Sequence, residues 1–584
     1  MSRATLSHAG RSRGLALVAA GAVLAPVVLA APGAAAARRH AAAPAPAGPG
    51  AASHFDLARK DCVGTARTTA SKVWFTVADG VLSDVYEPTI DTTNVESMRF
   101  VVTDGRGFTE VQGRDTTYTV STDGTGMACT VTTSSKAGRY RLVTTYITDP
   151  GRDAVVVRTR LVGGGDLRLY VRLDANVGGN GGGGEVNGGA DTGTVAGGVP
   201  VVSDENTTTN AANRDYARPT HLALTAARPL PEASVGFAGT AGDGLTMLDA
   251  DRRLTAFDGA PGGNVVATAR LPLAGGVTTF ALGFGRTRRQ AIATGHAAAH
   301  RPFAATLADY TAGWLAYDRK LAAPPPGGGK DAYYLSANVI KASEDKTFPG
   351  AIVASLASPW GQAVSAADLP GGRPVYFGSY REVFSRDLYE AFTGLLVAGD
   401  LATARATAAF LLDRQQLPDG RMPRNSLING KPAPDSGGDQ LDETAYPILM
   451  AYQSGLGGRW DSVRRAADFL VAHGPAFGVE RWEEQSGFSP STIAAQIAGL
   501  VAGAELADRN GDAARARLYR ATADHFTRSI KDWAITTTGP YGPRYFLRLS
   551  RDGDPNAATS YNLGNGGPTE DQRRVVDAGF LELT

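Results

Sequence analysis

Short segments in which apolar and polar residues alternate fill the chain from residue 51 to about residue 286. Typical examples are RYRLVTTYITDPG (139–151) and RDAVVVRTRLVGGG (152–165), in which residues such as Val, Thr and Tyr precede a turn rich in Gly, Asp or Pro. A repeat of two residues places one set of side chains on one face of a strand. We therefore predict a large antiparallel β-sandwich over residues 51–286.

The pattern changes to a helical one near Thr287. The following segment is rich in Ala and has apolar residues three or four positions apart, until PPPGGG (324–329) interrupts it. We predict one connecting helix and a linker over residues 287–330.

From residue 331 to residue 584 the apolar spacing is that of helices separated by long loops. Asp400 stands where a helix N-cap is expected, and Ser489-Pro490 is typical of an N-cap followed by a proline at the first helical position. The predicted helices span residues 331–344, 386–398, 401–416, 440–454, 459–472, 490–508, 512–530 and 568–582. The fold class is thus multidomain, with a β-domain before a helical one.

The N-terminus has the three parts of a signal peptide. Arg3, Arg11 and Arg13 precede the apolar run 14–31, and small residues follow it. A retained membrane anchor is less consistent with Pro26 and with the Ala-rich end of the run. We predict a signal peptide over 1–37, an Ala/Pro linker over 38–50, and a secreted protein that is free of the membrane after cleavage.

Charge and cysteine content narrow the function classes. The 584 residues include 58 Lys+Arg and 57 Asp+Glu, so the net charge of +1 argues against a nucleic-acid binder. Cys62 and Cys129 either form one disulfide or remain two free thiols, and the sequence leaves this open. We expect no cofactor and no metal at the functional site, although an acidic loop could hold a structural Ca²⁺.

The densest chemical cluster is ERWEEQSGFSPST (480–492). It places Glu483 and Glu484 beside Trp482, directly before a predicted helix. A neighbouring like charge and apolar cover can make a Glu act as a general acid, and a Trp face can pack on a sugar ring. A solvated loop without chemistry is the alternative.

Two further clusters precede predicted helices. In VYFGSYREVFSRDLYE (375–390), Arg386 and Asp387 follow Tyr380, and the pair could bind vicinal hydroxyls or simply serve the helix dipole. In 419–447, three polar residues at a helix start are either the lining of a site or a cap. These three residues are Gln440, Asp442 and Glu443.

At these clusters the chain resembles glycoside hydrolase family 15, in its bacterial glucoamylase and glucodextranase type. The resemblance covers nearly everything after residue 55. Its motifs are GTARTTASKVWFTVADGVLSDVYEP (64–88), FALGFG (280–285), EDKTFPGAIVASLASPWG (344–361), SRDLY (385–389), QLDETAYP (440–447), RWEEQSGFSPSTIA (481–494) and VVDAGFLEL (575–583).

The resemblance implies an N-terminal antiparallel β-sandwich and a catalytic (α/α)6 barrel. It implies an exo-acting, inverting hydrolase that releases β-glucose from the non-reducing ends of α-glucans, and we expect a monomer. Glu483 matches the general acid, while Arg386 and Asp387 match the pair that holds the terminal glucose. The remaining site residues would line the sugar site: Tyr380, Trp360, Gln440, Asp442, Glu443, Trp482 and Glu484.

The chain departs from the family at its end and in its aromatic residues. The barrel needs twelve helices and eight are predicted here, so residues 331–584 would form a partial barrel without the last helical pair, which carries the general base. We therefore expect a C-terminally truncated member that contains the acid but no base and hydrolyses little. Phe384 stands where a Trp of the family is expected, and the loop 421–439 lacks the usual Trp residues, with Leu427 and Asp435 in their places.

Three other functions remain open at this stage. The chain could be a non-catalytic glucan-binding protein or an inactive fragment. An inverting disaccharide phosphorylase fits the motifs less well, and the preference between α-1,4 and α-1,6 bonds is undetermined.

Overall fold

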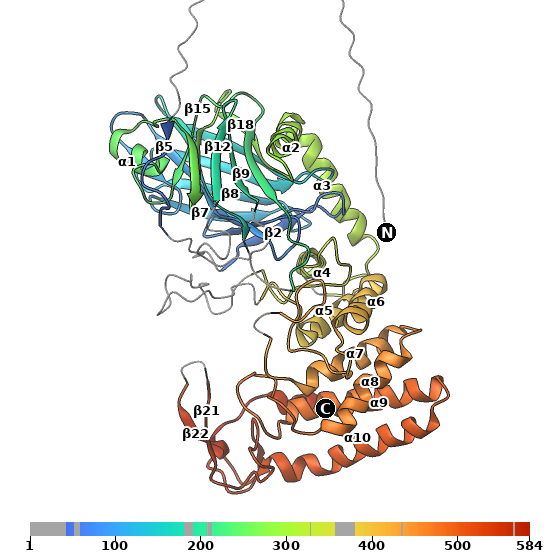
Figure 1. Cartoon of the computed structure of the whole chain (residues 1–584). Helices are drawn as coiled ribbons and strands as arrows, with labels where there is room; N and C mark the ends of the chain where they lie inside the picture. Colours follow the sequence, from blue (N-terminus) through green and yellow to red (C-terminus); the bar gives the residue numbers. More distant parts are fainter. Residues whose placement is uncertain are drawn as a thin grey trace, which may run out of the picture. The chain divides into compact units, whose positions relative to one another are not determined.

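The computed structural model describes residues 43–51, 59–179, 191–205, 207, 213–327, 329–356, 380–433, 436–564 and 567–584. The signal peptide expected over 1–37 and the site residue Trp360 lie outside these ranges. The described residues form two large β-sheets, followed along the chain by helices (Figure 1).

One sheet has ten strands and the facing sheet has eight. In spatial order, the ten are β1 (Ala43–Pro44), β16 (Phe257–Gly263), β12 (Asp191–Ala196), β13 (Val199–Asp204), β14 (Thr220–Ala226), β18 (Val277–Gly285), β10 (Ala154–Gly163), β9 (Tyr140–Thr148), β8 (Cys129–Ser135) and β7 (Thr116–Thr122). The eight are β15 (Glu232–Phe237), β17 (Val265–Arg270), β11 (Arg168–Gly179), β5 (Thr93–Thr103), β4 (Val81–Tyr86), β3 (Trp74–Ala78) and β2 (Cys62–Thr65), with β6 (Thr109–Val111) paired to β5. Only the β1–β16 pair is parallel among these neighbours.

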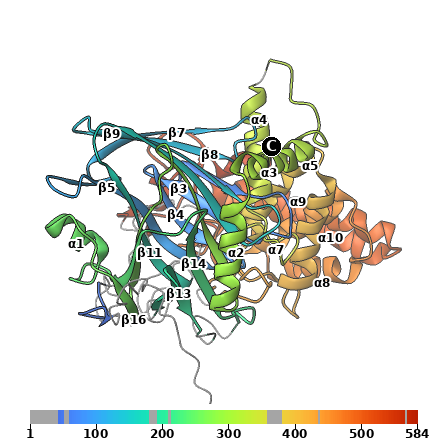
Figure 2. The ribbon, with the colours of Figure 1, turned by 90° about the horizontal axis from the view of Figure 1, so that it is seen from above.

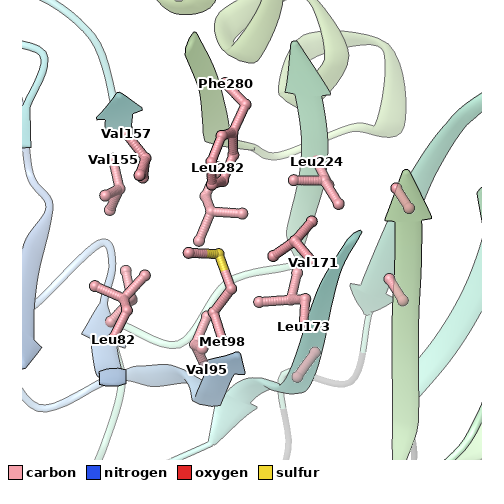
Figure 3. Close-up of a cluster of buried hydrophobic side chains, with 14 of the residues drawn as sticks. Leu82, Val95, Met98, Val155, Val157, Val171, Leu173, Leu224, Phe280 and Leu282 are labelled. Atoms are coloured by element: carbon pink, nitrogen blue, oxygen red, sulfur yellow. The ribbon is translucent and has the colours of Figure 1, made fainter. Parts of the chain in front are cut away.

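The predicted sandwich is confirmed, and its core lies between the two sheets. Figure 3 shows Phe280 and Leu282 of the ten-stranded sheet pointing toward Met98 of the eight-stranded sheet. The alternation that predicted the strands recurs in the burial of β8, in which every second residue is buried. Cys62 and Cys129 form a disulfide that joins β2 to β8, with their Cα atoms 6.5 Å apart, so the bridged alternative holds.

The segment expected to hold one connecting helix forms two. These are α2 (Arg288–His300) and α3 (Phe303–Asp318), and Pro302 separates them because it cannot continue the hydrogen bonds of α2. Figure 2 shows α2 along β14, and a Cβ atom on Gly283 of β18 would lie 2.3 Å from the backbone nitrogen of Gly295 in α2. The sandwich also contains α1 (Gly244–Asp251), which was not predicted and is capped by Asp243.

Seven of the eight predicted helices are present within a few residues of their expected bounds. They are α4 (Lys330–Ala342), α5 (Ser385–Val397), α6 (Leu401–Phe410) with a π-helical turn (Leu411–Gln415), α7 (Leu441–Ser454), α8 (Trp460–His473), α9 (Pro490–Arg509) and α10 (Ala513–Ala534). In the described part of the chain, no helix has the length and apolar character needed to cross a membrane.

The helix predicted over 568–582 is wrong. The chain there forms β22 (Thr569–Asp571), paired with β21 (Ser560–Asn562), and two 3-10 turns (Gln572–Arg574 and Gly579–Leu583). Tyr545 and Tyr541 donate hydrogen bonds to the carbonyls of Arg573 and Arg574, and the Arg548 N–H donates to the carbonyl of Val575. These long-range bonds use carbonyls that an α-helix would pair internally. A two-stranded sheet of β19 (Ile535–Thr536) and β20 (Tyr545–Phe546) precedes this segment.

Strands β3 and β4 are buried on both faces because helices cover the outer face of their sheet. Trp74, Tyr86 and Ile90 share a core with side chains of the helical region, among them Val383 and Phe392. The Trp74 indole donates a hydrogen bond of 2.8 Å to the carbonyl of Ala342, the last residue of α4. The sandwich therefore packs against the part of the helical region that contains the end of α4 and the start of α5.

Candidate functional site

The loop that carries Glu483 is a tight turn closed by its own backbone. The Glu483 N–H donates to the carbonyl of Glu480 at 2.8 Å, and the Glu480 N–H donates to the carbonyl of Gln485 at 2.7 Å. The Trp482 N–H donates to the Glu480 carboxylate at 3.1 Å. Glu483 has a φ of 67°, a left-handed conformation that is uncommon for a residue other than Gly. Such conformations often occur at functional sites, where surrounding contacts maintain them.

Arg386, at the N-terminus of α5, brings the three predicted clusters together. Its guanidinium donates to Gln440 at 3.0 Å and to Asp442 at 2.8 Å, both at the start of α7. It also lies 3.4 Å from the carboxylate of Glu443 and 3.5 Å from that of Glu483. One cation thus joins two helix N-termini to the 480–485 turn.

Asp442 and Glu443 are fully buried, and burying two carboxylates is costly unless they are paired. Glu443 accepts a hydrogen bond of 2.9 Å from the Arg386 backbone N–H, which places its carboxyl group at the N-terminus of α5. Burial raises the pKa of Glu443 to about 8, although Arg386 favours its charged form. The carboxylates are therefore held by one guanidinium that also faces Glu483.

Asp387 differs from its neighbour because its side chain is exposed. The surrounding protein partly desolvates the carboxyl and raises its pKa, while the charge of Arg386 opposes this rise. Among the described residues, the Asp387 carboxylate accepts no side-chain hydrogen bond. It can therefore accept hydroxyl hydrogens from a ligand, as the predicted Arg386–Asp387 pair requires.

Arg424 was not predicted as a site residue, and it lies 3.1 Å from the second carboxylate oxygen of Glu483. Its loop is held beside the start of α5 by reciprocal backbone hydrogen bonds of 2.9 Å between Val383 and Ser426. The side chain of Asn425 adds a 2.5 Å hydrogen bond to Glu382. The segment 419–447 is predicted to contribute Gln440, Asp442 and Glu443 to the site, but nothing in the local sequence distinguishes Arg424 from Arg421 in the same loop.

Glu484 and Trp482 are held by the part of the chain after α10. Arg548 donates to the carboxylate of Glu484 at 3.0 Å and to that of Glu480 at 2.6 Å. The indole of Trp482 donates to Asp577 at 2.7 Å and leaves the side chain 51% exposed. Arg548 was also missed, because its segment matches no predicted element.

The aromatic residues near the site are placed differently from one another. Tyr380 is half-buried, and its backbone carbonyl accepts a hydrogen bond of 2.7 Å from Ser355. Phe384 and Leu427, which replace expected Trp residues, are buried in the protein and present no stacking face. Trp360 and Asp435 lie outside the described residues.

The site combines a carboxyl group that can exchange a proton, guanidinium groups that can donate to hydroxyls, and an exposed indole. Within the described ranges, no group of three or more His, Cys, Asp or Glu residues is gathered as for a metal ion. The arrangement suits acid-assisted cleavage of a bond in a polyhydroxylated ligand.

Comparison with known proteins finds two family matches and, among the similar proteins, one curated glucoamylase and one solved glucoamylase structure. Residues 45–319 match the family described as glucodextranase, domain N, and residues 426–584 match glycosyl hydrolases family 15. The chain is 33% identical over 545 residues to the glucoamylase of Clostridium sp. (strain G0005), covering 92% of this chain and 73% of that protein. The crystal structure of a bacterial glucoamylase complexed with acarbose has a TM-score of 0.83 and 32% identity, over 93% of this chain and 77% of that one.

Proposed function

Because the chain belongs to glycosyl hydrolase family 15, we propose that it is an exo-acting, inverting α-glucosidase that releases β-glucose from the non-reducing ends of α-glucans. The fold is that of a β-sandwich with an (α/α)6-type helical domain, as in the bacterial glucoamylase. That relative binds acarbose, which supports an α-glucan oligosaccharide as the ligand of this chain. The expected substrates are starch, dextran or oligosaccharides derived from them.

The observation that carries this proposal is the convergence of Arg386 and Arg424 on the Glu483 carboxylate. We assign Glu483 as the general acid, which protonates the leaving glycosidic oxygen while the bond to the anomeric carbon breaks. Arg386 and Asp387 hold hydroxyls of the terminal glucose as donor and acceptor, respectively. Trp482 packs against a sugar ring through its exposed face.

An inverting reaction also needs a carboxylate that activates water on the opposite face of the sugar, about 6.5–9.5 Å from the acid. We assign this base to none of the residues that the structure describes. Loss of a general base typically lowers the rate by about 10²–10⁴. We therefore expect a polypeptide limited to residues 1–584 to bind glucan-like ligands and to release glucose slowly.

The direct test uses the full chain and two measurements. Acarbose affinity is measured by calorimetry, and glucose release from maltotriose and isomaltotriose is followed by NMR, which identifies the anomer. Binding together with slow release of β-glucose supports the proposal, and the preferred trisaccharide gives the linkage. A failure to bind acarbose contradicts it, and release of α-glucose contradicts the inverting mechanism.

A second experiment separates a missing base from a misfolded site. In α-glucosyl fluoride the leaving group needs little protonation, and azide attacks the anomeric carbon without a base, giving β-glucosyl azide and fluoride. We expect azide to accelerate fluoride release by the chain. Glu483→Gln should retain this reaction while losing trisaccharide hydrolysis. Acarbose binding without turnover in any assay would instead favour a glucan-binding protein.

We also propose that the protein is secreted after cleavage near residue 37, on the basis of the charged and apolar pattern over 1–37. Expression of the full chain with its N-terminus intact, followed by mass spectrometry of the culture medium, tests this. A mature protein in the medium that begins near residue 38 is expected. An unprocessed chain retained in cells would contradict secretion.

A further inference from the structure

Arg548 follows the 480–485 turn by more than 60 residues in the chain, yet its side chain contacts two residues of that turn. Its Nη2 atom is 2.6 Å from a carboxylate oxygen of Glu480 and 3.0 Å from one of Glu484. Glu483 lies between these two residues in the chain. From this geometry we infer that Arg548 is a positioning residue that holds Glu483 in place, an inference that rests on the proposed role of Glu483 as acid.

The backbone around Arg548 is itself anchored on both sides. The Arg548 N–H donates to the carbonyl of Val575 at 2.9 Å, and the Leu547 N–H donates to the carbonyl of Ala534, at the end of α10. Phe488, just beyond the turn, exchanges backbone hydrogen bonds of 2.8 and 3.2 Å with Ser550. The guanidinium is therefore presented to the turn from a fixed segment.

The carboxylate of Glu480 is fully buried, so its pairing with Arg548 matters for the stability of the turn. One oxygen accepts from Arg548 and the other accepts from the Trp482 N–H, so both oxygens serve the turn. Burial raises the pKa of Glu480, and Arg548 opposes this by favouring the charged form. Without Arg548 a buried carboxylate loses its cation, and it must take up a proton or move toward water. Either change weakens the bond to Trp482.

The Glu484 side chain also lies beside the backbone of Gly564. A Cβ atom placed on Gly564 would lie 2.7 Å from the Glu484 carboxyl carbon, so the Glu484 side chain lies close to the backbone of this glycine. Glu483 has a left-handed φ of 67°. Its backbone is bonded to Glu480, which pairs with Arg548, and it is followed by Glu484, which pairs with Arg548 and lies beside Gly564. A left-handed non-glycine residue relaxes when such contacts are removed.

The experiment compares Arg548→Met and Arg548→Lys with the matched control Arg551→Met. Arg551 also contacts the turn, through a 2.7 Å hydrogen bond to the neutral side chain of Gln485. In the described part of the chain it forms an ion pair with neither Glu480 nor Glu484. Hydrogen–deuterium exchange of peptides covering 480–485 reports the turn directly, since the N–H groups of Glu480, Trp482 and Glu483 are all bonded within it. Acarbose affinity and the kinetics of glucose release are measured on the same variants.

We expect Arg548→Met to raise exchange in this peptide at least tenfold and to lower kcat about 10–100-fold, with KM changed less than threefold. Arg548→Lys should recover part of both, because it keeps the charge but carries it on a flexible stem instead of a rigid guanidinium. Arg551→Met should change each value less than threefold. Unchanged exchange in Arg548→Met, or equal effects of Arg548→Met and Arg551→Met, would overturn the inference.

If Arg548→Met does not fold, the double variant Glu480→Gln/Arg548→Met removes the buried charge with its partner. It should restore the melting temperature but not the protection of the Glu483 N–H, since the contact between residue 548 and Glu484 is still missing. Full restoration of protection would show that Arg548 only neutralises Glu480 and would overturn the positioning role. The proposed function fails separately, if the unmodified chain neither binds acarbose nor releases glucose. The exchange data then still decide whether Arg548 holds the turn.

Discussion

The guanidinium of Arg386 lies 3.5 Å from the carboxylate of Glu483, which joins the N-terminus of α5 to the turn before α9. The same guanidinium lies 2.8 Å from Asp442. A single planar cation therefore sets the distance between the proposed acid and the helix starts that line the site. Its fork geometry allows several carboxylates to be bound at once.

Replacing Arg386 by Lys tests how far the site depends on the planar guanidinium group. Arg386→Lys keeps one positive charge but loses the several donors, so we expect kcat/KM for trisaccharides and acarbose affinity to fall about 10–100-fold. The melting temperature should fall as well, because Asp442 and Glu443 are buried and lose part of their pairing. Calorimetry and thermal unfolding measure the two effects. Wild-type affinity in this variant would contradict the role of Arg386.

The variant Arg424→Gln tests the effect of the second guanidinium that contacts Glu483, the proposed acid. A guanidinium 3.1 Å from Glu483 favours the ionised carboxylate, which cannot donate a proton. Without it, Glu483 should retain its proton to higher pH, so the alkaline limb of the kcat/KM profile should move upward. Glucose release measured from pH 4 to pH 9 checks this. Arg421→Gln, in the same loop and paired with Asp419 and Asp439, is the matched control and should leave the limb in place.

Glu87 should make the stability of the protein depend on pH. Burial raises its pKa from 4.5 to about 8, although Arg218 opposes the shift. The native state thus binds more protons than the unfolded state between these values, and this contribution is fully present below pH 4.5 and is lost as pH rises through 8. Glu87→Gln should flatten the fall of the unfolding free energy by about 1 kcal/mol per pH unit in this window. Urea unfolding at pH 5 and pH 8 measures it, and an unchanged slope would contradict the assignment.

Lys346 should stabilise the contact between the sandwich and the loop after α4. Its ammonium donates bonds of 2.7 Å to Thr65, Ala66 and Ser71, and it lies 4.9 Å from the centre of the Trp74 ring. Lys346→Met leaves these acceptors without their donor, so we expect a loss of about 2 kcal/mol or more in unfolding free energy.

The matched control for this change is Lys72→Met. Lys72 makes one exposed hydrogen bond of 2.9 Å to Thr347 in the same loop, and its loss should cost about 0.5 kcal/mol or less. Chemical unfolding of both variants at one pH gives the comparison. Equal losses would show that the buried contacts of Lys346 carry no special weight.

Most of the secondary structure could be predicted from the chain because its cause is local. The period of two in β8 and β10 and the helical spacing in α8 reflect which side chains face a core, and each is visible within about ten residues. The helix predicted over 568–582 failed because Tyr541, Tyr545 and Arg548 bond to its carbonyls from elsewhere in the chain. Such competition has no signal within the segment itself.

Residue type and spacing are properties of short segments, so the two kinds of domain and the chemical character of the main site residues can be predicted from the chain alone. These residues are Arg386, Asp442, Glu443 and Glu483. The packing of the folded chain shows that these residues meet, that Arg424 faces Glu483, and that Arg548 contacts Glu480 and Glu484. It also decided that Phe384 and Leu427 are buried rather than exposed to a ligand. The physical reason is that charge pairing and burial depend on distances in space. Residues far apart in the chain acquire those distances only when the helices and sheets pack together.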